Sequence, residues 1–485
     1  MGRIVPLLML VALAGTASCR KQPEGAVKVV VIGATPALRD PLDGPLSAPD
    51  QLLVANVAQG LVRFDAGGNV VAGLAERWTV TDDGLSYIFR LAATNWPDGT
   101  KLTAQQVARL LKREIGGRSR NSLKDAFGAV EDIVAMTDRV IEINLTSPRP
   151  DLLSLLAQPQ MAIVRNGQGT GPFAGVRGKD GAIKLSRQTF SPEDETTSRE
   201  QLLLAGAQAP AAVQAFAAEN LDLVLGGTFA DLAYAQRVKL PRDSLRFDPA
   251  SGLFGLVPRQ AGGPLDKPEI RQLLSEAIDR DTFVTATGVT GLASRATLLE
   301  SALDGTPTPI APAWTATPYA NRLAGLQAQA NRLFGKAAKP TVRIALPDGP
   351  GADFLLQLLQ RDWGQLGLKV ELAENPEAAD LTLIDEVAPS SSPSWFVRHF
   401  RCDRVAVCDP KADELMDGAR QSPVPAQRYA LLGQAAALID RGQLFLPIAA
   451  PVRWSLVSAR IQNFAGNRYA RHTLTDLEAR APTGG

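Results

Sequence analysis

Histidine and cysteine are scarce in this chain of 485 residues, which has 2 histidines and 3 cysteines. With only His399 and His472 available, no cluster has the spacing of the three or four ligands that a zinc ion needs. The G-x-S-x-G sequence of serine hydrolases is missing, and the pair Gly178-Lys179 is followed by Asp180, which does not fit a phosphate-binding loop. We therefore expect no catalytic residue, no metal and no cofactor, and the protein is predicted not to be an enzyme.

The chain also lacks an excess of charge of either sign. Its 51 Lys and Arg residues nearly balance its 50 Asp and Glu residues, for a formal net charge of +1. Without a basic field or a basic amphipathic tract, neither nucleic acid nor a membrane surface is an expected partner. Beyond the N-terminus no apolar run is long enough to span a bilayer, so we expect contact with a membrane only through a lipid anchor.

The first 18 residues have the pattern of an export signal. A positive start at Arg3 precedes an apolar stretch at 4–14, and small residues at 15–18 come directly before Cys19. We predict a signal peptide over 1–18 and a lipidated Cys19 that begins a tether over 19–26, which would anchor the protein in the periplasm. Thr16 stands where such signals usually have leucine, so cleavage without lipidation stays an alternative.

The rest of the chain is too long for one hydrophobic core, and we expect two or three domains. The almost continuous apolar run at 27–32 is typical of a buried strand. Segments 342–346, 352–366 and 368–372 follow a strand, helix and strand pattern, which predicts a βαβ unit and a mainly parallel sheet. A further strand is expected to end at Ile384.

Residues 60–107 carry the most informative pattern. Two strands are expected around the turn at 82–84, and Thr103 is placed to cap a helix. The second of these strands has alternating residues on its apolar face: Tyr87, Phe89 and Leu91.

This pattern resembles one family, the extracellular solute-binding proteins of peptide-type ABC importers. The matching positions are Gly60-Leu61, Asp65, Gly68, Leu74-Ala75-Glu76, Trp78, Asp83-Gly84, Tyr87, Phe89, Leu91, Trp96, Asp98-Gly99, Thr103-Ala104 and Val107. A second block at 266–280 resembles a helix of the same family, and Gly169–Phe173 resembles the segment that returns from the second domain to the first. The chain departs from the family pattern at Gln59, Ala92, Val257 and Ile384.

The resemblance implies an α/β fold with two lobes joined by crossover strands and an extra domain inserted into the first lobe, as in large peptide-binding periplasmic proteins. The expected divisions are 27–58, 169–255 and 456–485 for lobe I, 59–168 for the inserted domain II and 256–455 for lobe II. The implied function is capture of a peptide or similar small solute between the lobes and delivery to an ABC permease and ATPase complex. We expect the protein to act as a monomer.

Asp385 is the main candidate for solute binding. Peptide-binding members have an Asp-x-x-x-Pro sequence at this place, and the resemblance implies that its carboxylate pairs with the α-ammonium of the ligand. A solvated loop aspartate is the alternative reading. Trp395 would line the cleft or pack its helix, and Arg401 and Arg404 would meet a ligand carboxylate or remain surface charges.

Cys402 and Cys408 are the two thiols left if Cys19 is acylated. Export to an oxidising compartment makes a disulfide between them the expected state, with free or redox-active thiols as the alternative. A family member that has lost transport, or one that binds a sugar or an opine, are the other interpretations of the whole chain.

Overall fold

The computed structural model describes residues 25–191, 196–301, 303–335 and 340–479. The predicted signal peptide, Cys19 and most of the predicted tether lie outside the described residues. Within these ranges, no helix is both long enough and apolar enough to cross a membrane.

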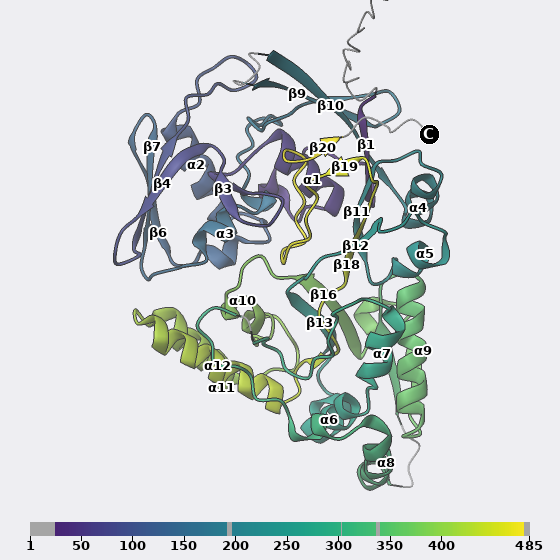
Figure 1. Cartoon of the computed structure of the whole chain (residues 1–485). Coiled ribbons are helices and arrows are strands. Elements are labelled where there is room, and N and C mark those ends of the chain that lie inside the picture. The colour runs from purple at the N-terminus through teal and green to yellow at the C-terminus, as the bar shows by residue number, and fades with distance from the viewer. Residues whose placement is uncertain (1–24, 192–195, 302, 336–339, 480–485) are drawn as a thin grey trace, which may run out of the picture.

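A mixed sheet of seven strands forms the first lobe, at the top of Figure 1. Across the sheet the strands are β12 (Leu245–Phe247), β18 (Arg453–Val457), β11 (Leu223–Thr228), β1 (Val27–Ile32), β10 (Thr196–Ala207), β9 (Ile183–Ser191) and β8 (Ala174–Arg177). β1 has the predicted bounds and pairs in parallel with β10 and β11. Because it lies inside the sheet, its three consecutive valines at 29–31 are all buried, which explains the continuous apolar run.

Three helices belong to this lobe: α1 (Ala48–Val57), α4 (Ala209–Ala217) and α5 (Leu232–Arg237). The C-terminal segment returns to the same lobe and contains the short strands β19 (Ile461–Gln462) and β20 (Glu478–Ala479), which pair with each other.

The inserted domain is built on a separate antiparallel sheet, to the left of the first lobe in Figure 1. Its strands, in order, are β4 (Ala75–Val80), β5 (Ser86–Leu91), β7 (Val140–Leu145) and β6 (Val130–Thr137). A small hairpin of β2 (Val62–Phe64) and β3 (Val70–Ala72) precedes the sheet, and α2 (Ala104–Ile115) and α3 (Leu152–Leu156) complete the domain. The predicted apolar face of β5 is buried, and Thr103 accepts a hydrogen bond from Gln106 N as the cap of α2.

The glycine-rich segment after the inserted domain lies directly against the end of α1. Gly171 N donates to Val57 O at 3.0 Å, and Phe173 N donates to Asn56 O at 3.0 Å. A Cβ atom on Gly171 would lie 2.5 Å from the carbonyl carbon of Val57, so only glycine allows this approach. The chain then enters β8, which confirms that this segment returns to the first lobe.

The second lobe, below the first in Figure 1, contains a sheet of five strands. Across the sheet they are β15 (Lys369–Leu372), β14 (Thr341–Ala345), β16 (Leu381–Val387), β13 (Gly252–Pro258) and β17 (Leu446–Pro447). Its helices are α6 (Pro268–Glu276), α7 (Arg280–Thr287), α8 (Tyr319–Phe334), α9 (Pro350–Gly364), α10 (Pro393–Arg398), α11 (Pro410–Gln421) and α12 (Pro425–Arg441).

The predicted βαβ unit is confirmed as β14, α9 and β15, with the two strands parallel. The prediction of a mainly parallel sheet is wrong, since β13 runs antiparallel to both of its neighbours, β16 and β17. A βαβ pattern fixes the direction of its own two strands, and it carries no information about strands that enter the sheet from another lobe.

The chain passes between the two sheets twice, from β12 to β13 and from β17 to β18. The domain boundaries expected at 255/256 and 455/456 fall inside β13 and β18, so the sheets place both passages a few residues earlier. The lobes also share one hydrophobic core, in which the Phe229 ring lies 4.7 Å from that of Phe254 and the Phe254 ring 5.4 Å from that of Phe283. A short apolar run does not show which sheet it will join, which is why these boundaries differ.

Candidate solute-binding site

Asp385 lies inside strand β16, which continues to Val387. The prediction that the strand ends at Ile384 is therefore wrong, because register with Phe254 of β13 extends the pairing through the polar residue. Asp385 Oδ1 accepts a hydrogen bond from Arg453 Nη1 at 2.7 Å, and Arg453 Nη2 donates to Asp385 O at 2.9 Å. Arg453 opens β18 in the other sheet, so this ion pair joins the two lobes.

The pair is largely shielded from solvent, with 15% of the Arg453 side chain and 14% of the Asp385 side chain exposed. Burial raises the pKa of Asp385 above its ordinary value, while the positive charge of Arg453 opposes that rise. Among the described residues, only Oδ1 of the carboxylate has a hydrogen-bond partner. Oδ2 is therefore available to a second donor.

Two further polar side chains meet the same region. Gln158, from the inserted domain, donates through Nε2 to Pro389 O of the second lobe at 2.7 Å. Its Oε1 accepts from Arg471 Nε of the C-terminal segment at 3.1 Å. We refer to the five residues Gln158, Asp385, Pro389, Arg453 and Arg471 as the junction, because they bring together both lobes and the inserted domain.

A cavity of about 100 Å³ adjoins the junction. Gln158 and Arg471 form part of its wall, together with Val31 of β1 and Gly226 of β11. The wall thus reaches the carboxyl ends of two parallel strands, the usual position of ligands in open α/β sheets. Pockets for small molecules generally measure about 300–1,000 Å³, so this cavity must widen to admit a peptide.

Arg471 has no carboxylate within ion-pair distance in the described part of the chain, although it is partly buried. Burial, and next the nearby charge of Arg453, lower the pKa of Arg471 to about 10. An unpaired guanidinium in the wall of a cavity is suited to bind a carboxylate. No sequence signal distinguishes this arginine, because Gln158, its hydrogen-bond partner, lies 313 residues away along the chain.

Trp395 lies in α10 and is 7% exposed. Its ring packs 4.5 Å from that of His399 and 5.0 Å from that of Phe396, within a hydrophobic cluster of the second lobe. His399 Nε2 lies 3.4 Å from Glu386, and this hydrogen bond holds the pKa of Glu386 below its ordinary value. The contacts of Trp395 are those of a packing residue, and its role in the cleft stays a prediction.

Arg401 and Arg404 are not in the junction. Both line another cavity, between the inserted domain and the second lobe, whose wall does not include Asp385. Arg401 Nη1 pairs with Asp417 at 2.9 Å, and Arg404 pairs with Asp125 of the inserted domain. The structure therefore separates these arginines from the predicted amine anchor, and their role toward a solute also stays a prediction.

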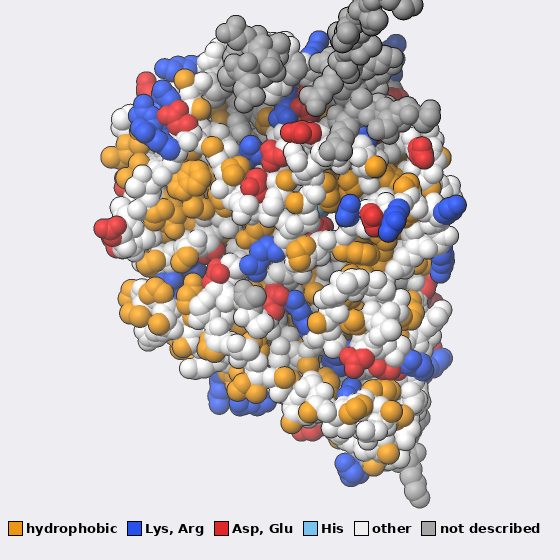
Figure 2. Space-filling view, viewed as in Figure 1, with side chains coloured by type: hydrophobic (Ala, Val, Ile, Leu, Met, Phe, Trp, Pro, Cys, Tyr) orange, Lys and Arg blue, Asp and Glu red, His pale blue; other side chains and the backbone are white. Residues whose placement is uncertain are grey.

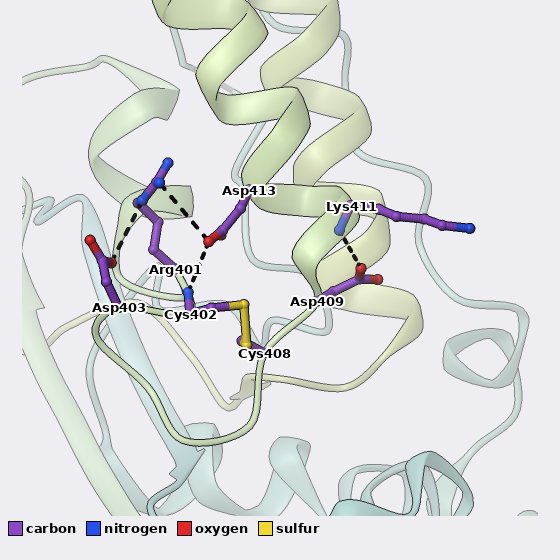
Figure 3. Close-up of a disulfide and its surroundings, with 7 residues drawn as sticks. All are labelled: Arg401, Cys402, Asp403, Cys408, Asp409, Lys411 and Asp413. Atoms are coloured by element: carbon purple, nitrogen blue, oxygen red, sulfur yellow. Dashed lines mark hydrogen bonds and ion pairs between the residues drawn. A yellow bond between two sulfur atoms is a disulfide. The ribbon is translucent and has the colours of Figure 1, made fainter.

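The predicted disulfide between Cys402 and Cys408 is present, with the two Cα atoms 5.1 Å apart (Figure 3). Cys402 N donates to Asp413 Oδ2 at 3.1 Å, which ties the loop to α11. Arg401 Nε lies 3.6 Å from Asp403 within the same loop. The disulfide thus closes the loop that carries Arg401 and Arg404.

The second histidine, His472, lies in the C-terminal segment that returns to the first lobe. His472 Nε2 lies 3.1 Å from Asp248 Oδ2, on the passage toward β13. In the ranges that the structure describes, no three His, Cys, Asp or Glu residues gather as a metal site would require. Basic and acidic side chains are interspersed over the visible face in Figure 2, as the near-neutral net charge leads one to expect.

Two α/β lobes, two connecting passages and a polar junction between them define a bilobal binding protein. The sequence matches the family described as bacterial extracellular solute-binding proteins, family 5, over residues 69–396. The chain belongs to this family. It is accordingly a solute-binding component of an ABC importer, and the family consists of binding proteins rather than enzymes.

Individual relatives agree with this assignment. The chain is 26% identical to the "Probable di/tripeptide-binding protein 5" of Pseudomonas aeruginosa, over 85% of this chain and 88% of that protein. The fold is similar to that of Haemophilus influenzae OppA in complex with the peptide RPPGFSPFR, with a TM-score of 0.79, 17% identity and coverage of 95% of this chain and 100% of that one. It is also similar to that of AgaA from A. tumefaciens R10 in complex with agropinic acid, with a TM-score of 0.72, 16% identity and coverage of 94% and 99%.

Proposed function

We propose that this protein binds short peptides at the junction and delivers them to an ABC permease. The observation that carries the proposal is the presence, in one region, of a carboxylate oxygen and a guanidinium that have no ionic partner of their own: Asp385 Oδ2 and Arg471. A peptide in water carries an ammonium at one end and a carboxylate at the other. These two groups complement the two ends, and the relatives named as di/tripeptide-binding support the same class of solute.

In this proposal Asp385 keeps its contact with Arg453 through Oδ1 and receives the peptide ammonium at Oδ2. Arg471 turns from Gln158, its neutral partner, to the peptide carboxylate. Since a charge-assisted hydrogen bond is stronger than one to a neutral amide, the exchange favours the bound state. Asp385 and Arg453 belong to different lobes. A solute bound to Asp385 would therefore lie between the lobes, where its binding can change with their closure.

Isothermal titration with one dipeptide in three forms tests the proposal: unmodified, N-acetylated and C-amidated. A hydrogen bond to a charged group contributes roughly 1.5–3 kcal/mol, so each modification is expected to weaken binding about ten- to a hundredfold. Asp385→Asn should lose affinity for the unmodified peptide and become insensitive to acetylation. Arg471→Gln should likewise become insensitive to amidation.

Arg468→Gln is the matched control, because Arg468 lies three residues away, packs on the Tyr469 ring and does not line the cavity. It should bind all three forms as the unmodified protein does. If acetylation and amidation both leave the affinity unchanged, the peptide proposal is wrong and a non-peptide solute, such as a sugar or an opine, takes its place.

The proposed place of action is the periplasm, with the protein anchored by lipid at Cys19. The small residues at 15–18 before this cysteine support the proposal. Intact-mass measurement on the membrane fraction should show a diacyl or triacyl increment on a chain that begins at Cys19. An unmodified Cys19 in a freely soluble protein would contradict the anchor and leave the solute proposal untouched.

A further inference from the structure

The cavity between the inserted domain and the second lobe measures about 440 Å³ and has a strongly basic wall. Arg149, just before α3, contributes from the inserted domain, and Arg398 and Arg428 contribute from α10 and α12. The cavity is spanned by contacts between the two parts, among them the ion pair of Arg404 with Asp125. A ligand that contacts Arg149 together with Arg398 or Arg428 would therefore touch both parts at once.

The carboxylates in this wall are already neutralised. Asp125 pairs with Arg404, while Asp417 pairs with Arg401 at 2.9 Å and with Arg420 at 3.2 Å. The remaining carboxylate in the wall, Asp403, lies 3.6 Å from Arg401. All three acids thus lie within ion-pair distance of arginines other than Arg149, Arg398 and Arg428.

Those three arginines have no ion-pair partner in the described part of the chain. Each also has a buried Nε without a hydrogen-bond partner. Arg428 is 2% exposed and donates to the carbonyls of Pro148 at 2.5 Å and Ser422 at 2.8 Å, both neutral groups. Arg149 and Arg398 are half-buried as whole residues, and Arg428 is buried. Charge held away from water without a counter-ion is costly, so three such groups in one wall indicate that a partner is missing.

The electrostatics of the site agree. Burial, followed by the nearby Arg404 charge, lowers the pKa of Arg398 to about 10. Burial and then the Arg149 charge lower the pKa of Arg428 as well. A further carboxylate, Asp151, feels the charge of Arg149 but accepts its side-chain hydrogen bond from Ser390 at 3.0 Å and lies outside the cavity wall.

We propose that Arg149, Arg398 and Arg428 form a second binding site, distinct from the junction, for a multiply charged oxyanion with phosphate or carboxylate oxygens. Planar guanidinium groups bind such oxygens in pairs, and an anion with several oxygens can satisfy more than one of them. Because the arginines come from two parts of the molecule, the bound anion links the inserted domain to the second lobe and stabilises their contact.

Titration of the purified protein with inorganic phosphate and with citrate, in a chloride buffer, tests the site by calorimetry and thermal unfolding. Binding of either anion should raise the melting temperature, and the preference between the two distinguishes phosphate from carboxylate chemistry. Arg398→Gln and Arg149→Gln should each reduce the anion affinity about tenfold or more. Both variants should also be at least as stable as the unmodified protein without anion, because they remove an unpaired charge.

Arg420→Gln is the matched control, since Arg420 lines the same cavity, pairs with Asp417 and has 64% of its side chain exposed. It should change the anion affinity less than about twofold. The proposal is overturned if neither anion binds at about 10 mM, or if Arg398→Gln and Arg420→Gln bind equally well. Titration of the same variants with a dipeptide distinguishes this site from the junction. Their dipeptide affinity should be unchanged, because the junction residues are unaltered.

Discussion

Charged groups are paired in the junction and partly unpaired in the cavity lined by Arg149, Arg398 and Arg428, which we call the basic cavity. In the junction, Asp385 and Arg453 satisfy each other across the lobes, and Gln158 holds Arg471. In the basic cavity, Arg149, Arg398 and Arg428 have no acid within ion-pair distance among the described residues, and the Nε atom of each has no hydrogen-bond partner. The charged groups of the junction thus have partners without solute, whereas our proposal leaves the basic cavity with an electrostatic cost that a bound anion would remove.

This difference indicates that charged side chains can affect the contact between two domains in two ways. An ion pair between lobes fixes their relative position and can exchange one of its contacts when a solute arrives. Unpaired like charges do the reverse, since they weaken an interface until a ligand of opposite sign joins it. Both regions lie where separate domains meet, so each can couple binding to domain position.

Breaking the ion pair of the junction should give the largest effect. Arg453→Gln leaves Asp385 without its cation in a largely shielded site, and we expect a loss of roughly 2–3 kcal/mol in the free energy of unfolding. Urea denaturation measures this. Arg242→Gln is the control, as Arg242 is 96% exposed and its removal should cost less than about 0.5 kcal/mol. Equal losses in the two variants would show that the Asp385 pair does not hold the lobes.

Removing the disulfide beside the basic cavity should have the next largest effect. Replacing Cys402 and Cys408 by serine frees a short loop, and the chain-entropy model gives a loss of about 2 kcal/mol. Because this loop carries Arg401 and Arg404, which neutralise the acids of the cavity, we also expect weaker anion binding. Alkylation of the denatured, unreduced protein should label neither cysteine, and labelling of both would contradict an oxidised pair.

Asp151 should give the smallest and most pH-dependent effect. Burial raises its pKa in the folded state above the ordinary value near 3.8, so the folded protein binds this proton more tightly than the unfolded chain. The stability that it contributes is therefore present at low pH and is lost as the pH rises through the folded pKa. Asp151→Asn should flatten the decline in stability as the pH rises above about 4, which urea midpoints measured over a pH series would show.

Asp151→Asn also tests the difference between the junction and the basic cavity, since Asp151 accepts a hydrogen bond from Ser390, next to Pro389 of the junction, and its charge acts on Arg398 and Arg428. Its charge raises the pKa of Arg398 and Arg428, so removing it increases the net positive charge that a phosphate ion meets. Phosphate affinity should rise a few-fold, while dipeptide affinity should stay unchanged. A fall in phosphate affinity would place Asp151 inside the anion site rather than beside it.

Much of the fold could be predicted from local sequence. β1 has its predicted bounds, the alternating face of β5 is buried, and Thr103 caps α2. These features depend on residues close together in the chain, where apolar spacing and capping chemistry act directly. Several strands were not predicted, among them β6, β8 and β9, because edge and hairpin strands with one solvated face carry a weak apolar pattern.

The candidate site was only partly predictable. Asp385 was predicted from a resemblance to a family motif; it lies in the junction, and its role toward a solute stays a prediction. Arg453, Arg471 and Gln158 gave no signal, since each makes its important contact with a residue 68 or more positions away. Arg149, Arg398 and Arg428 carry no sequence signal either, because it is the packing of α10 and α12 against the inserted domain that brings them to one cavity.

The sequence by itself determined the family, the order of most elements and the disulfide, because these follow from local spacing and from the chemistry of single residue types. The tertiary structure alone decided which charges are paired and which are not. Whether an arginine has a partner depends on distances of a few ångströms between segments far apart in the chain, and on the burial that makes an unpaired charge costly. For that reason the two proposed binding regions depend on how the lobes and the inserted domain pack together.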